Sequence, residues 1–166
     1  METTLLANAA NRFGILAIML ALTPPFFNAD RAEAAKEKHD TICQLCGMDS
    51  AKSETEFILY RKTAPEMHAC CANCARRLMK KLGTEITEIT TLDYRTRKQV
   101  AARNAFYILG SKRLPRGSMA PYVFAFESRK DADEFKDRYS GSVLEFDEML
   151  KELETIKKRE QPDLKQ

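Results

Sequence analysis

Residues 55–83 read TEFILYRKTAPEMHACCANCARRLMKKLG, and this stretch contains the signals that decide the fold. Its first part, TEFILYR, is rich in β-branched and aromatic residues, which is typical of a strand. A Thr-Ala-Pro turn leads to EMHACC, so that a second strand completes a hairpin. The apolar residues of CANCARRLMKKL then recur at helical spacing up to Gly83, which predicts a helix that begins at the thiols.

Residues 85–94, EITEITTLDY, alternate as a strand with one buried face, which completes a first set of strand, strand, helix and strand. The same order of elements returns in the second half of the chain. The segments that follow are predicted as two strands, a helix capped by Ser128 and a last strand, in residues 99–111, 121–128, 129–139 and 141–147. We therefore expect an α+β fold that consists of a tandem of two small ββαβ units, preceded by a signal peptide.

The N-terminus predicts export. FGILAIMLALTPPFF, residues 13–27, carries no charge, but Pro24 and Pro25 end it before the length of a spanning helix. Ala32 and Ala34 then supply the small residues of a cleavage site, and an uncleaved anchor is the alternative. The expected domains are a signal peptide, an N-terminal cysteine-rich metal-binding ββαβ unit, a C-terminal ββαβ unit and a charged helical or disordered tail, in residues 1–34, 35–95, 96–150 and 151–166.

Composition excludes several classes of function. The 27 Lys and Arg residues are mixed with 24 Asp and Glu residues along the chain, so no clustered nucleic-acid footprint exists. The sequence also lacks a Ser/His/Asp arrangement, a phosphate-binding glycine loop and a carboxylate pair in a catalytic context. We therefore expect a protein that is not an enzyme.

All five cysteines lie within residues 43–74. Two C-x2-C pairs, Cys43 with Cys46 and Cys71 with Cys74, are spaced as in a zinc ribbon and could enclose a tetrahedral metal ion. Disulfide bonding is the alternative in an oxidising compartment. Neither pair is followed by histidine, which excludes covalent haem attachment. Cys70 is left over, and it could be either a small buried residue or a ligand.

Softer donors surround these thiols and shift the expectation towards copper. The helix dipole at Cys71 and Cys74 favours thiolates there. Thiolate and thioether ligands together select Cu(I) over Zn²⁺. The candidate donors besides the cysteines are Met48, His68 and Met119. Met67 is equally a candidate core residue and a candidate ligand. His39 is expected to be a solvated residue.

The mature chain resembles the NosL family, the exported copper-binding accessory proteins of nitrous oxide reductase. The resemblance is carried by CQLCGM, by DYRTRKQVAARNAFYILGS and by GSMAPYVFAFESRKDADEFKDRYSGSVLEFDEM, and it covers residues 42–150. It implies a tandem of ββαβ units, Cu(I) binding and metal delivery during enzyme maturation. The family's Cys-Gly-Met turn falls on Cys46, Gly47 and Met48, and its methionine loop falls on Met119. Two departures are the lack of a cysteine before Cys43, which a lipoprotein anchor would need, and the additional CCANC cluster.

The sequence therefore predicts a periplasmic copper(I) metallochaperone that serves a client metalloenzyme such as nitrous oxide reductase. The candidate metal ligands are Cys43, Cys46, Met48, His68, Cys70, Cys71, Cys74 and Met119. One alternative is an interaction module in which Cys43, Cys46, Cys71 and Cys74 hold a structural zinc ion. The other is a thiol-disulfide oxidoreductase that uses Cys71 and Cys74, although the expected thioredoxin-like βαβ setting is missing.

Overall fold

The structure is a computed structural model that describes residues 41–160. The predicted signal peptide lies outside these residues. Within them, none of the helices has the length and apolar character needed to cross a bilayer. The strands are β1 Phe57–Arg61, β2 Met67–Ala69, β3 Ile86–Leu92, β4 Gln99–Ala101, β5 Phe106–Leu109, β6 Val123–Phe126 and β7 Ser142–Leu144. The helices are α1 Ala72–Leu82, α2 Arg129–Tyr139 and α3 Phe146–Glu160, with short 3-10 turns η2 Ser50–Lys52, η3 Gly83–Glu85 and η4 Ala102–Asn104.

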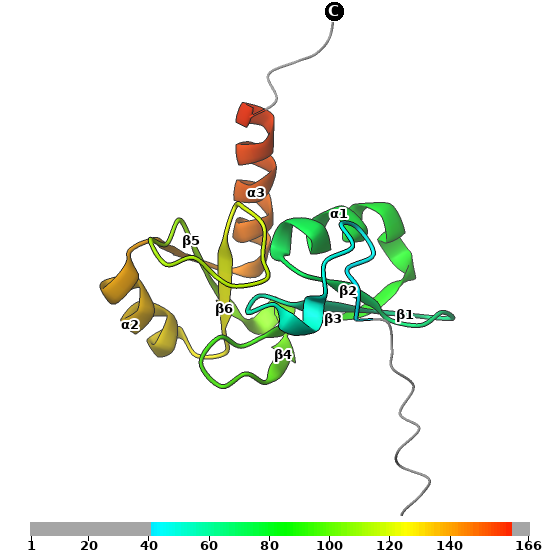
Figure 1. Cartoon of the computed structure of the whole chain (residues 1–166), viewed down its shortest axis with the longest axis horizontal. Coiled ribbons are helices and arrows are strands. Elements are labelled where there is room, and N and C mark those ends of the chain that lie inside the picture. The colour runs from blue at the N-terminus through cyan, green and yellow to red at the C-terminus, as the bar shows by residue number, and fades with distance from the viewer. Residues whose placement is uncertain (1–40, 161–166) are drawn as a thin grey trace, which may run out of the picture. The chain divides into compact units, whose positions relative to one another are not determined.

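The strands form two antiparallel sheets that are flanked by helices, which confirms the α+β class (Figure 1). One sheet has the strand order β2-β1-β3-β4, and the other has the order β6-β5-β7. The first sheet is associated with α1 and the second with α2. Strand β1 lies between β2 and β3 in the first sheet, and β5 likewise lies between β6 and β7 in the second. The first strand of each set is thus the central one.

The predicted hairpin and helix of residues 55–83 are confirmed. Strands β1 and β2 pair in an antiparallel register that sets Phe57 opposite Ala69. Helix α1 has Cys71 as its N-cap and ends at Gly83, whose N–H donates to the carbonyl of Met79. Gly83 has a φ of 54°, a conformation that glycine adopts without strain.

The single strand predicted over residues 99–111 is wrong. The structure divides it into β4, the turn η4 and β5, because β4 pairs with β3 of the first sheet whereas β5 pairs with β6 and β7 of the second. The turn is fixed by the buried Tyr107, whose hydroxyl donates to the carbonyl of Ala102 at 2.6 Å. The chain therefore changes sheets at η4.

Helix α2 closes one side of the second sheet. Ser128 caps it, as predicted, because its side chain accepts the N–H of Asp131. Phe135 on α2 packs against Phe124 and Phe126 of β6, with ring centroids 4.8 and 5.1 Å apart. Tyr94 contacts the same three rings edge-on. This aromatic group forms a core of its own beside the sheet.

A second, larger core joins α1, α3 and both sheets. Helix α3 begins within the predicted last strand segment and buries Phe146, Met149 and Leu153 completely or nearly so. Glu154 of α3 also forms an ion pair with Arg76 of α1. The first turn of the expected charged tail is thus part of the core, because Leu153 continues the apolar helix face that begins with Phe146 and Met149.

The loop from 110 to 122, which connects β5 to β6, is attached to the segment that precedes β1. Glu54 is 6% exposed and accepts hydrogen bonds from the backbone N–H and the guanidinium of Arg116, each at 3.1 Å. Gly117 lies so close that a Cβ atom there would stand 2.8 Å from the carbonyl oxygen of Lys52. Burial raises the pKa of Glu54, but the hydrogen bonds and charge of Arg116 outweigh it, and the pKa is lowered overall.

We predict that Glu54→Gln destabilises the protein by about 1–3 kcal/mol at pH 7, the range for a hydrogen-bonded charged group. Because the folded pKa of Glu54 lies below its unfolded value of about 4.3, the carboxylate stabilises the fold above that pH, and this contribution is lost as the pH falls through the folded pKa. Urea denaturation at pH 7 and near pH 3 measures both effects. Glu134→Gln, which removes an exposed carboxylate paired with Arg95, is the control and should change stability much less. Equal losses in the two variants would contradict the prediction.

Candidate metal centre

The first two thiols lie on a knuckle, the tight turn of residues 43–48. The N–H of Cys43 donates to the carbonyl of Met48 at 2.7 Å, and the N–H of Gly47 donates to the carbonyl of Cys43 at 2.9 Å. Gly47 has a φ of 77°, which explains the glycine at this position. The turn directs Cys43 into the core and leaves Cys46 exposed.

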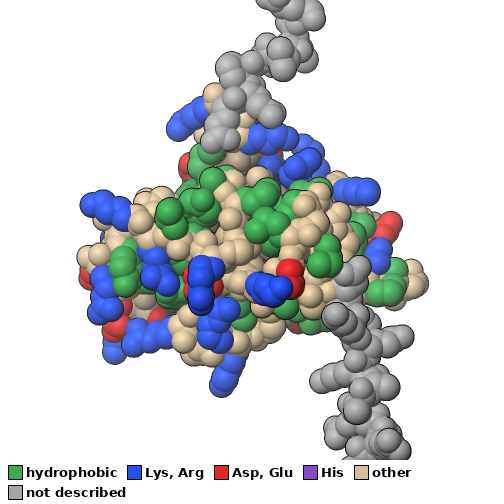
Figure 2. Space-filling view, viewed as in Figure 1, with side chains coloured by type: hydrophobic (Ala, Val, Ile, Leu, Met, Phe, Trp, Pro, Cys, Tyr) green, Lys and Arg blue, Asp and Glu red, His purple; other side chains and the backbone are tan. Residues whose placement is uncertain are grey.

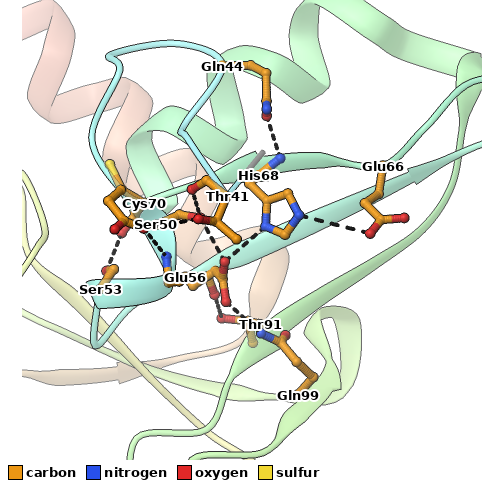
Figure 3. Close-up of polar contacts among 12 residues, drawn as sticks. Thr41, Gln44, Ser50, Ser53, Glu56, Glu66, His68, Cys70, Thr91 and Gln99 are labelled. Carbon is orange, nitrogen blue, oxygen red and sulfur yellow. Dashed lines mark hydrogen bonds and ion pairs between the residues drawn. The ribbon is translucent and has the colours of Figure 1, made fainter. Parts of the chain in front are cut away.

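Gln44 attaches the knuckle to strand β2. Its backbone N–H donates to the carbonyl of His68 at 3.1 Å. In return its side-chain oxygen accepts the N–H of His68, a contact that Figure 3 shows. The knuckle is thereby held beside the end of β2, where the other thiols begin.

The remaining thiols lie where β2 meets α1. Cys70 directly precedes Cys71, the extended N-cap residue of α1, and Cys74 lies in the first turn of that helix. The sulfur of Cys70 is 3.4 Å from that of Cys46 and 3.9 Å from that of Cys74. The sulfur atoms of Cys43, Cys46, Cys70 and Cys74 all lie within 4.8 Å of one another. We call these four residues the thiol cluster.

Cys71 borders the thiol cluster without being one of its four members. It is 1% exposed and is the N-cap residue of α1. Hydrogen bonds with Cys70 and Cys74 lower the pKa of Cys71 to about 3, and the backbone N–H groups of Cys74 and Met119 contribute to this shift. The loop between β5 and β6 therefore reaches the fifth thiol.

The thiols share protons through their mutual hydrogen bonds. Bonds with Cys70 and Cys74 lower the pKa of Cys43. The pKa values of Cys70 and Cys74 are raised, chiefly by their hydrogen bonds to Cys43 and in part by burial. Because buried anions repel one another, the metal-free protein favours thiolates that are hydrogen-bonded by neighbouring thiols. A bound metal ion replaces those protons with its own charge.

Two hydroxyl groups fix the backbone at Cys70. The carbonyl of Cys70 accepts the Ser53 hydroxyl at 2.6 Å and lies 3.0 Å from the Thr55 hydroxyl. The Thr55 oxygen also lies 2.8 Å from that of Ser118, which precedes Met119. Ser53 and Thr55 are both buried, and these direct hydrogen bonds connect the thiol cluster with the loop between β5 and β6.

The other predicted donors lie on the knuckle, on β2 and on the loop between β5 and β6. Met48, Met67 and Met119 are half-buried and pack against the core that contains the buried thiols. His68 is not part of the group of converging ligand atoms. Its Nδ1 is 3.0 Å from Glu56, and Figure 3 shows the ring directed at Glu56 and Glu66. This position agrees with a hydrogen-bonded histidine on β2.

The arrangement of the thiol cluster suits a closed metal site. A tetrahedral ion with S–metal bonds of about 2.3 Å separates its sulfur ligands by about 3.8 Å, close to the 3.4 and 3.9 Å found here. The cluster also offers more thiolates than a Cu(I) ion needs. The donor set therefore fits a soft or borderline cation.

Sequence reasoning identified the thiols but paired them differently. It grouped Cys71 with Cys74, whereas the structure brings Cys70 and Cys74 to the first pair. It missed the supporting residues Gln44, Ser53 and Thr55, because the hydrogen bonds of these polar side chains join segments that are far apart in the sequence. No local signal separates Cys70 from Cys71, because both precede the first residue of the helix.

Comparisons with known proteins point in one direction. The model of the NosL family matches residues 34–154. The crystal structure of the copper chaperone NosL from Shewanella denitrificans is similar to this chain, with 26% identity and a TM-score of 0.52 over 64% of this chain and 87% of that one. A comparison with curated proteins finds no match.

We predict that Cys70→Ser abolishes tetrahedral thiolate coordination and that Cys71→Ser preserves it. Co²⁺ serves as the probe, because its absorption bands report the number of thiolate ligands. Since loss of an outer-shell partner already weakens metal affinity about 10–100-fold, loss of a direct ligand should weaken it at least as much. Cys71→Ser is the matched control, because it removes a neighbouring buried thiol. The opposite pattern would show that Cys71 is the ligand.

Proposed function

The chain belongs to the NosL family, and from this premise we propose that it is an exported copper(I)-binding accessory protein that delivers copper to a client metalloenzyme. The observation that carries the proposal is the convergence of Cys43, Cys46, Cys70 and Cys74 within 4.8 Å. The similarity to a copper chaperone supports the choice of metal. Copper is here a cargo that must be both held and released.

We assign Cu(I) to Met48 and to thiols of the thiol cluster, Cys43, Cys46, Cys70 and Cys74. Met119 is a further candidate ligand, and His68 is the weakest candidate because Glu56 already engages it. A soft ion that is offered more donors than it needs can move by stepwise ligand exchange. Such exchange is what delivery requires.

The proposed client is a copper enzyme such as nitrous oxide reductase, and the proposed location is the periplasm. Both follow from the family and from the predicted signal peptide. The protein itself is proposed to catalyse no reaction. We also propose that the two sheets are copies of one ββαβ unit, which the common strand orders β2-β1-β3 and β6-β5-β7 support.

A structural zinc site is the second candidate, and the convergence of four thiols, with the Cys70 sulfur 3.4 and 3.9 Å from those of Cys46 and Cys74, favours it. In that case the ion would stabilise the contact of the knuckle with α1. It would have no role for the thioether of Met48, because Zn²⁺ has little affinity for such ligands.

We predict that Met48→Leu weakens Cu(I) binding about tenfold or more, which corresponds to about 1.4 kcal/mol, and leaves Zn²⁺ binding unchanged. The reason is that the substitution keeps the apolar volume and removes only the soft sulfur donor. Anaerobic competition against a chelator of known affinity measures both constants and the stoichiometry.

Met79→Leu on α1 is the matched control, since Met79 is half-buried against the same core. It should bind both metals as the unsubstituted protein does. Tight Zn²⁺ binding combined with Cu(I) affinity that is the same in both variants would favour the structural zinc site.

A further inference from the structure

Two large hydrophobic side chains, Ile42 and Leu114, are exposed among the described residues. Ile42, which is 39% exposed, precedes Cys43 directly. Leu114, which is 64% exposed, lies on the loop between β5 and β6. A single exposed apolar side chain is ordinary by itself, but on a charged loop it can serve as the apolar anchor of an interface.

The loop that carries Leu114 is basic. Residues 110–121 include Lys112, Arg113 and Arg116 and contain no acidic residue. The buried Glu54 neutralises one of these charges. The loop therefore keeps a net positive charge, and on the face shown in Figure 2 Lys and Arg side chains stand beside hydrophobic ones.

This basic loop is fixed against the residues that follow the knuckle. The guanidinium of Arg116 forms an ion pair with Glu54, and the Arg116 side chain is nevertheless 86% exposed. Gly117 packs against the backbone of Lys52 and Ser53, and Ser118 bonds to Thr55, whose hydroxyl reaches the carbonyl of Cys70. A surface that is ordered before binding loses less entropy when a partner docks.

We propose that Leu114 and the basic residues Lys112, Arg113 and Arg116 form the docking surface for the protein that accepts copper, and that this partner presents an acidic face with an apolar contact. The inference rests on the proposed function, because it names the partner of the same metal site. Opposite charges accelerate the encounter of two proteins and fix their orientation. The hydrogen bonds from Ser118 through Thr55 to the carbonyl of Cys70 connect this surface with the thiol cluster.

The test measures the rate of Cu(I) transfer from the copper-loaded full chain to copper-free nitrous oxide reductase. Lys112→Glu and Leu114→Ser are the variants, since both side chains are exposed and neither is a candidate ligand. Lys151→Glu on α3 is the matched control, with the same charge change at another exposed lysine. Each protein is first shown to bind Cu(I) with unchanged affinity.

We expect Lys112→Glu to slow transfer about tenfold at low salt, since steered association exceeds the neutral rate by at least this factor. The difference should shrink in about 300 mM NaCl, because salt screens exposed charges. Leu114→Ser should slow transfer at both salt concentrations, and Lys151→Glu should transfer copper normally.

Equal transfer rates in all four proteins would overturn the docking surface and leave the copper chaperone intact. Normal transfer by Lys112→Glu together with weaker binding to vesicles of phosphatidylserine and phosphatidylcholine would assign the loop to a membrane and also overturn the proposal. Failure of the unsubstituted protein to bind Cu(I) or to transfer it would overturn the proposed function, and the docking surface with it.

Discussion

The burial of four thiols in one apolar core is the constraint on which the rest of the structure depends. Cys43, Cys70, Cys71 and Cys74 are each at most 1% exposed. Sulfur atoms that ionise there repel one another, so they must share protons or bind a cation. The knuckle, the start of α1 and the loop between β5 and β6 all meet at this point. The first sheet and the second are therefore joined around the same small group of atoms.

Local signals were sufficient to predict much of the fold. The hairpin of β1 and β2, the end of α1 at Gly83 and the cap of α2 at Ser128 each depend on residues close in sequence. The break at η4 was not predictable in this way, because an unbroken run of strand-forming residues does not reveal that its two ends join different sheets. The packing of α3 against α1 is likewise a long-range property.

The candidate site shows the same division between local and distant information. The sequence identified every thiol, since the spacing of cysteines is a local signal. It did not reveal that Cys70 rather than Cys71 completes the thiol cluster, because the choice depends on how β2 turns into α1. It also could not reveal that Thr55 connects Cys70 with Ser118, because Thr55 and Ser118 are 63 residues apart in the sequence. Those hydrogen bonds exist only after the two sheets have assembled.

The unequal exposure of the thiols gives the site a direction. Cys46 is exposed, whereas the other three members of the thiol cluster are buried. Under the proposed copper delivery, an acceptor would meet Cys46 before the buried sulfur atoms, so ligand exchange would begin at Cys46. Access to the proposed site is therefore one-sided, and burial would set the order in which the ligands exchange.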